Sequence, residues 1–191
     1  SLFIKRLNEL CHRGRFTGID FNWEHPEGSH ELRGYQHLID ETRQIFPNGT
    51  IISVAQSPWR DYRRPIYDAA DRIHIMSYNH KFPQGRMVDS RADVDRMLGF
   101  GCPRRKIVLG VPFYGRNRKG RSRTYAELAA SSPELTEDVT DGFAFNSPET
   151  VRQKLRYARD ERLAGLMIWE VGQDATDANL SLLSAIADEL P

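Results

Sequence analysis

The sequence contains little cysteine and no long apolar run. A membrane-spanning helix needs about 18 or more consecutive apolar residues, and every apolar stretch of this 191-residue chain is shorter, so no membrane association is predicted. The start, Ser1 to Leu10, carries Lys5 and Arg6 within an amphipathic pattern, which predicts a helix and not a signal peptide.

The two cysteines, Cys11 and Cys102, form no CxxC motif. They predict neither a disulfide framework nor a redox site. We expect both to be small buried side chains, and they leave the compartment open.

The charges also lack an excess of one sign. The chain carries 27 Lys and Arg residues against 26 Asp and Glu residues, for a net charge of +1. No basic face of the kind that binds a phosphate backbone is visible, so nucleic acid is not an expected partner. The local exception is the basic stretch from Arg116 to Arg123, which we expect to be a solvated loop.

Motifs for metals and nucleotides are missing as well. The six histidines show no HExxH or similar ligand spacing, and no glycine-rich phosphate-binding loop occurs. We therefore expect neither a metal site nor a cofactor. The hydrophobic fraction of 39% is ordinary for a globular domain with its own core, so we treat residues 1–191 as a single domain.

Short apolar segments alternate with amphipathic helical patterns along the chain, which is typical of βα units around a parallel sheet. The expected strands are Phe16–Trp23, Thr50–Ala55, Arg72–Tyr78, Lys106–Phe113 and Gly165–Trp169. The expected helices are Leu2–His12, Gly34–Phe46, Arg63–Ala70, Arg91–Phe100, Pro148–Leu163 and Asn179–Leu190. So few βα units cannot close an eight-stranded barrel, which takes about 250 residues. We expect an α/β chain that supplies part of a (β/α)8 barrel, with the missing units before Ser1, or an open five-stranded sheet.

The most informative segment runs from Thr17 to Glu24. Alternation along a strand puts Asp20, Asn22 and Glu24 on one face, while the apolar residues between them face the other way. Polar side chains inside a strand cost free energy unless they are satisfied or used. Three in succession, ending where the strand ends, indicate a functional site.

This segment resembles the signature strand DGxDxDWE of glycoside hydrolase family 18, the chitinases and their relatives. Gly18, Asp20, Trp23 and Glu24 match it in register. Three later segments are similar to the motifs of the family's sixth, seventh and eighth strands, in the same order: Ile75–Asn79, Leu109–Arg116 and Gly165–Glu170. The resemblance implies a (β/α)8 barrel of which strands 4 to 8 are present.

The resemblance also implies hydrolysis without an enzyme nucleophile. In this family the 2-acetamido oxygen of the substrate attacks the anomeric carbon while a carboxylic acid protonates the leaving oxygen, and water then opens the oxazolinium ion with retention. Glu24 would serve as acid and then as base, Tyr78 would hold the acetamido carbonyl, and Trp169 would stack on the sugar at subsite −1. The remaining substrate-binding positions would be Met76, Asn79, Tyr114 and Arg116.

Three positions depart from the family pattern: Thr17, Asn22 and Asn79 each replace an Asp. Thr17 weakens the expected support of Asp20. Asn79 can still form hydrogen bonds with the substrate but adds no charge. Asn22 keeps the shape of the residue beside the acid but offers no negative charge to an oxazolinium ion. The loss of charge assistance costs about 1 to 2 kcal/mol, or roughly tenfold to thirtyfold in rate, so we expect a slow enzyme.

The resemblance therefore predicts a chitinase-like hydrolase that acts on chitin or N-acetylglucosamine oligosaccharides. A carbohydrate-binding lectin on the same scaffold and an endo-β-N-acetylglucosaminidase remain alternatives. For Trp169 and Tyr78, core packing is the alternative role. About 30 residues separate Arg116 from the helix before the last strand, which we expect to be too short for a groove-deepening α+β insertion, so the predicted cleft is shallow.

Overall fold

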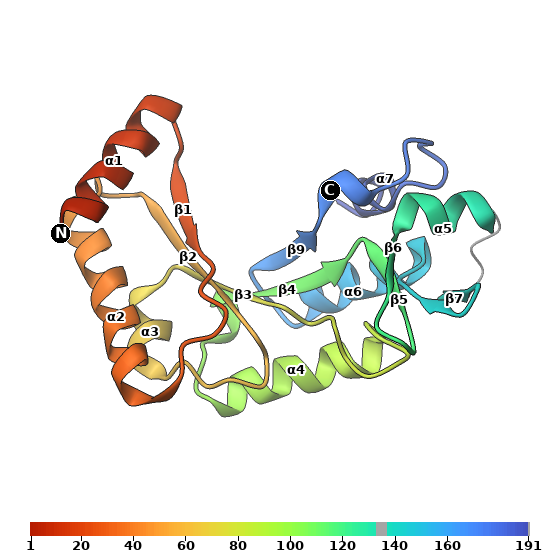
Figure 1. Ribbon diagram of the computed structural model, residues 1–191, viewed down its shortest axis with the longest axis horizontal. Coiled ribbons are helices and arrows are strands. Elements are labelled where there is room, and N and C mark those ends of the chain that lie inside the picture. The colour runs from red at the N-terminus through yellow and green to blue at the C-terminus, as the bar shows by residue number, and fades with distance from the viewer. Residues whose placement is uncertain (133–136, 191) are drawn as a thin grey trace.

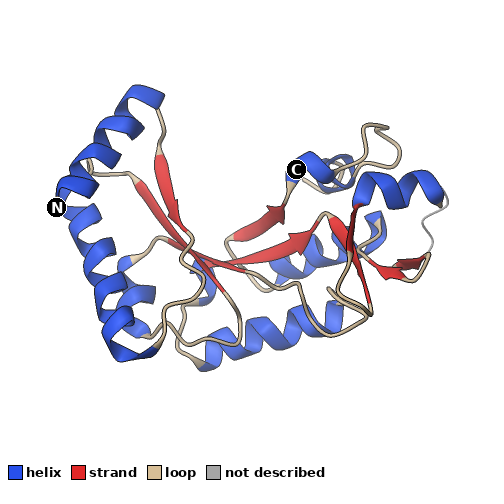
Figure 2. Ribbon diagram, viewed as in Figure 1, coloured by secondary structure: helices blue, strands red, loops and turns tan. Residues whose placement is uncertain are grey.

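A five-stranded parallel sheet forms the centre of the molecule (Figures 1 and 2). The computed structural model describes residues 1–132 and 137–190. The strand order is β1-β2-β3-β4-β9, and each pair of neighbours is parallel. The strands are β1 (Gly18–Phe21), β2 (Ile51–Gln56), β3 (Arg72–Ile75), β4 (Ile107–Pro112) and β9 (Gly165–Trp169). The sheet is a half-barrel, because it curves and its edge strands β1 and β9 lie on opposite sides of the opening (Figure 1).

The helices before, between and after the strands lie along the outer side of this curve (Figure 2). They are α1 (Leu2–Gly14), α2 (Gly28–Ile45), α3 (Arg64–Ala69), α4 (Met87–Gly99), α6 (Pro148–Asp160) and α7 (Leu182–Ala187), with short 3-10 helices at Arg104–Lys106 and Val171–Gln173. Helix α6 begins as predicted, since the Ser147 side chain accepts a hydrogen bond from the backbone N–H of Thr150 and Pro148 occupies the first turn. No helix among the described residues is long and apolar enough to cross a membrane.

The chain between β4 and α6 forms a second, antiparallel sheet. No α+β insertion is expected there from the sequence, because the segment is short. The order of this sheet is β6-β5-β8-β7, and its strands are β5 (Tyr114–Asn117), β6 (Ser122–Thr124), β7 (Val139–Thr140) and β8 (Phe143–Ala144). Helix α5 (Tyr125–Ser131) follows β6 directly and starts with a capping box of Thr124 and Glu127. The expectation was wrong because strands of two to four residues are enough to build a small α+β unit here.

The apolar side chains form two main cores. One lies between the sheet and helices α2, α3 and α4, and includes Ile52, Ile73 and Leu109. The other lies between β4, α5 and α6, and includes Val111 and Phe113. Both cysteines are buried, as predicted. Packing of these cores holds the helices on the sheet, at about 25 cal/mol per Å² of apolar surface removed from water.

Candidate active site

The carboxyl-terminal ends of four parallel strands bring the predicted site residues to one edge of the half-barrel. In barrels of this kind that edge carries the reactive groups. Asn22 and Glu24 follow β1, Tyr78 and Asn79 follow β3, and Trp169 ends β9. Tyr114 and Arg116 come from β5, directly after β4.

Asp20 is the innermost of the three polar residues on the β1 segment. Its Oδ1 accepts hydrogen bonds from the Ser53 hydroxyl at 2.5 Å and from His74 Nδ1 at 3.0 Å. Partial burial raises the pKa of Asp20, but the hydrogen bonds from His74 and Ser53 outweigh it and bring the pKa below the ordinary value. Thr17 is exposed, so Ser53 and His74 give Asp20 its support. Neither residue is among those predicted from the sequence, although a polar side chain inside an apolar strand is a signal that could have found them.

Glu24 lies beyond the end of β1 and is held by its neighbour. The Asn22 amide Nδ2 donates a hydrogen bond to Glu24 Oε1 at 3.1 Å, and the two side chains are exposed. Asn22 Oδ1 accepts no hydrogen bond from the described residues, so it is free to accept one from a ligand. The adjacent His25 contacts the hydroxyl of Ser57, the residue that follows β2, at 3.2 Å from Nδ1.

The opposite face of the β1 segment packs as the alternation predicts, except at its end. Phe21 packs against the core, and its carbonyl accepts a hydrogen bond from the Tyr35 hydroxyl at 2.9 Å. Trp23 contacts the Tyr35 ring edge-on at 5.5 Å but remains 39% exposed. The Tyr62 hydroxyl donates to the Trp23 carbonyl at 3.2 Å. Two tyrosines thus fix the backbone on both sides of Asn22.

Tyr78 lies in a small cluster with Met76, Tyr114 and Met167. It is 4% exposed. Burial, the adjacent Tyr114 and the charges of Glu24 and Asp20 together raise the pKa of Tyr78, so its phenol stays protonated and can donate a hydrogen bond. Gly110 on β4 makes room for the ring, because a Cβ there would lie 2.9 Å from Tyr78 Cε1 and closer still to a backbone oxygen of β3.

Asn79 joins the loop after β3 to the antiparallel sheet. Its Oδ1 accepts hydrogen bonds from the Tyr114 hydroxyl at 2.6 Å and from Arg116 Nη1 at 3.2 Å. These three residues line an open cavity of about 300 Å³ together with Ser122, Trp169 and Gln173. Trp169 is 47% exposed, so its ring is available for stacking and does not fill a core of this chain.

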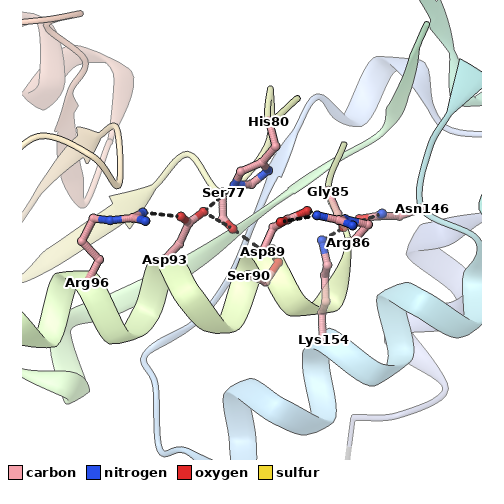
Figure 3. Close-up of polar contacts among 10 residues, drawn as sticks. All are labelled: Ser77, His80, Gly85, Arg86, Asp89, Ser90, Asp93, Arg96, Asn146 and Lys154. Atoms are coloured by element: carbon pink, nitrogen blue, oxygen red, sulfur yellow. Dashed lines mark hydrogen bonds and ion pairs between the residues drawn. The ribbon is translucent and has the colours of Figure 1, made fainter. Parts of the chain in front are cut away.

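The loop from Tyr78 to Arg86 is anchored by polar side chains beneath it (Figure 3). At its start, Asp93 of α4 accepts hydrogen bonds from the Ser77 hydroxyl at 2.8 Å and from His80 Nε2 at 2.8 Å. Its other carboxylate oxygen accepts from Arg96 at 2.8 Å. A buried carboxylate with this many donors is well compensated, so the start of the loop is fixed to α4.

The far end of the same loop is tied to α6 (Figure 3). The Asn146 amide donates to the carbonyl of Gly85 at 2.9 Å, and the Asn146 oxygen accepts from Lys154 Nζ at 2.8 Å. Lys154 is fully buried, and this burial lowers its pKa to about 7. Gly85 has φ of +68°, a conformation that favours glycine.

The side chains gathered at this edge carry carboxyl, amide, phenol and indole groups. Such groups can transfer a proton, form hydrogen bonds and stack on a sugar ring. No group of three or more His, Cys, Asp or Glu side chains that could hold a metal ion occurs among residues 1–132 and 137–190.

Comparison with known proteins identifies the family. Residues 1–174 match the family described as glycosyl hydrolases family 18. The chain belongs to this family. Among curated relatives, probable chitinase 2 of Drosophila melanogaster is 26% identical in an alignment 173 residues long, which covers 78% of this chain and 34% of the relative. The family 18 chain thus spans about a third of that relative's length.

Solved structures of chitinases and of a chitinase-like agglutinin share the fold of the half-barrel. A chitinase from Bacteroides thetaiotaomicron superposes with a TM-score of 0.88 at 20% identity, over 97% of this chain and 67% of that one. A mutant class V chitinase from Cycas revoluta in complex with (GlcNAc)3 gives a TM-score of 0.79 at 20% identity, over 98% and 72%. A chitinase-like agglutinin from Robinia pseudoacacia gives 0.81 at 19% identity, over 98% and 72%.

Proposed function

We propose that the protein is a retaining, substrate-assisted hydrolase of β-1,4-linked N-acetylglucosamine polymers, with Glu24 as the proton donor. The observation that carries this proposal is the Asn22–Glu24 hydrogen bond of 3.1 Å at the mouth of a parallel half-barrel whose family contains chitinases. An exposed carboxyl held by an amide, beside a buried phenol, is suited to proton transfer on a sugar.

The reaction proceeds in two steps. In the first, the acetamido oxygen of the substrate bonds to the anomeric carbon, the bond to the glycosidic oxygen breaks, and that oxygen takes the Glu24 proton. In the second, water bonds to the same carbon, Glu24 takes the water proton, and the acetamido oxygen leaves. Two inversions at one carbon give net retention.

Neighbouring side chains orient the sugar for the first step. The Tyr78 phenol, kept protonated by burial and by nearby negative charge, donates to the acetamido carbonyl and directs its oxygen toward the anomeric carbon. The Asn22 oxygen accepts from the acetamido N–H. The Trp169 ring, 47% exposed, stacks on the sugar face, with Met76 at the pocket floor. Asn79, Tyr114 and Arg116 contact the sugar hydroxyls at the rim.

A lectin is the second candidate, because a chitinase-like agglutinin shares the fold and Asn22 removes a charge from the site. The presence of Glu24 in a hydrogen-bonded position favours the hydrolase. An endo-β-N-acetylglucosaminidase would use the same residues and would differ only in the glycan it accepts.

The test is hydrolysis of a fluorogenic chitobioside by the full-length protein and by the Glu24→Gln variant. We expect slow turnover that disappears in Glu24→Gln, while oligosaccharide binding persists because the amide keeps the shape of the carboxyl. Tight binding without turnover in the parent protein would establish the lectin and end the hydrolase proposal.

A further inference from the structure

A second cavity adjoins the rim of the candidate active site. It measures about 470 Å³ and shares Asn79 and Arg116 with the cavity beside Trp169. Its walls come from two loops, the segment after β3 and the turn between β5 and β6. The other lining residues are His80, Lys81, Phe82, Gln84, Asn117, Arg118 and Gly120.

Positive charge dominates this cavity. Lys81, Arg116 and Arg118 line it, and no carboxylate is among the lining residues. Within the described part of the chain none of these three side chains forms a salt bridge. The carboxylates beneath the loop after β3 already form ion pairs with other residues. Asp89 pairs with Arg86, and Asp93 pairs with Arg96 and His80. The charge in the cavity is therefore available to a ligand.

Two contacts fix the cationic groups in place. The Arg118 guanidinium lies over the Phe82 ring, 4.5 Å from its centroid, and this stacking joins the two walls. Arg116 is held by Asn79 Oδ1 at 3.2 Å and by the carbonyl of Gly120 at 3.3 Å. A guanidinium held in one orientation loses less side-chain entropy when it binds an anionic group.

The wall also has unused hydrogen-bonding capacity. Gln84 is buried, and its amide nitrogen donates to the carbonyls of Tyr114 at 3.3 Å and Ala144 at 3.5 Å. Its Oε1 has no hydrogen-bond partner among the described residues, and the same holds for His80 Nδ1. Both atoms are buried, so a water ordered within the wall would supply such partners.

We infer that this cavity binds an anionic substituent, a carboxylate or a sulfate ester, on a sugar next to the cleaved linkage. The inference rests on the proposed function and narrows it: the preferred substrate is an N-acetylated glycan that carries acidic groups, and a polymer with free amino groups is disfavoured. The basic stretch from Arg116 to Arg123, for which the sequence predicts only a solvated loop, thereby gains a binding role.

The test measures binding to the full-length Glu24→Gln variant by titration calorimetry. The probes are tetrasaccharides of equal length: neutral chitotetraose, an alternating N-acetylglucosamine and N-acetylmuramic acid oligomer, O-sulfated chitotetraose and a partly deacetylated oligomer. We expect an acidic oligomer to bind about fivefold more tightly than the neutral one at low salt. The ratio should approach one at 1 M salt, where the Debye length is about 3 Å. The acidic probe that binds better identifies the substituent.

The double variant Lys81→Gln, Arg118→Gln should bring the ratio close to one, whereas the control Lys5→Gln, which removes an exposed charge on α1, should keep it. An affinity ratio of one in the Glu24→Gln protein, or a ratio that is unchanged when the double substitution is added, overturns the inference.

Hydrolysis by the unmodified protein is followed separately. Turnover without preference for acidic oligomers refutes the inference alone, selective binding without turnover refutes the hydrolase alone, and no binding to any probe refutes both.

Discussion

Restoring a carboxylate at position 22 should accelerate the reaction. In the Asn22→Asp variant a negative charge would replace the amide that lies 3.1 Å from Glu24 Oε1. Two unit charges about 4 Å apart interact by about 1 kcal/mol in water and by about 4 kcal/mol at an effective dielectric constant of about 20. Asn22 is exposed, so the benefit to the oxazolinium ion lies near the lower figure, at about 1 to 2 kcal/mol. This corresponds to a gain of about fivefold to thirtyfold in kcat.

The assay is the steady-state hydrolysis of a fluorogenic chitobioside over a range of pH, with Asn22→Asp compared with the parent and with Asn22→Ala. The alanine variant removes both the hydrogen bond to Glu24 and the acceptor for the acetamido N–H, so we expect it to be slower than the parent. Because the new charge acts only on the cationic intermediate and the transition states around it, kcat should rise more than KM changes. An Asn22→Asp variant no faster than the parent would refute the reasoning.

Three further predictions concern Gly110, Trp169 and Lys154. Gly110→Ala would push a Cβ to 2.9 Å from Tyr78 Cε1 and should cost about 1 to 3 kcal/mol in the free energy of unfolding as well as activity. Trp169→Ala should leave that free energy within about 1 kcal/mol, since the side chain is 47% exposed, but should weaken binding to chitotetraose about tenfold. For Lys154, whose buried pKa is about 7 instead of 10.5, the unfolded chain holds the extra proton between these pH values. The stability of the parent relative to Lys154→Met should therefore rise by about 1 kcal/mol per pH unit above pH 7.

Each of these predictions has a control and a contradicting result. A Cβ added at Gly34 on α2 would meet nothing within 4 Å, so Gly34→Ala should stabilise by about 0.5 to 1 kcal/mol in the denaturant titration that tests Gly110→Ala. A large loss of stability in Trp169→Ala would mean that the ring serves packing. A pH-independent difference between the parent and Lys154→Met would mean that the amine stays charged when buried.

The half-barrel could be predicted from the sequence because its strands are apolar and its helices amphipathic. The strand Gly165–Trp169 has the predicted bounds. The third strand ends at Ile75, three residues early, because the chain leaves the sheet to bring Met76 and Tyr78 into the cluster with Tyr114. The helix expected from Gly34 begins six residues earlier, at Gly28. The sequence does not reveal this start, because no side chain caps the helix.

The support of the candidate site was harder to predict than the residues proposed to react. Asp20, Asn22 and Glu24 follow one another along a single segment, so alternation alone assigns them to one face. Ser53 and His74 reach Asp20 from two other strands, and their proximity depends on the register between strands. The pairings Asp20 with Ser53 and Ala55 with His74 are set by the three-dimensional packing of the sheet and are not visible in the local pattern.

The anchoring of the loop between Tyr78 and Arg86 has a consequence for how sugars would enter. Asp93 holds its beginning and Asn146 its end, so the loop that lines the cavity is held in place without a ligand. Little chain entropy of this loop is then lost on association, and entry does not depend on a movement of the loop. Discrimination among polysaccharides would then come from shape complementarity and from electrostatic steering during the encounter. The association rates of preferred and disfavoured substrates should therefore differ, and the rate of the preferred one should fall as salt is added.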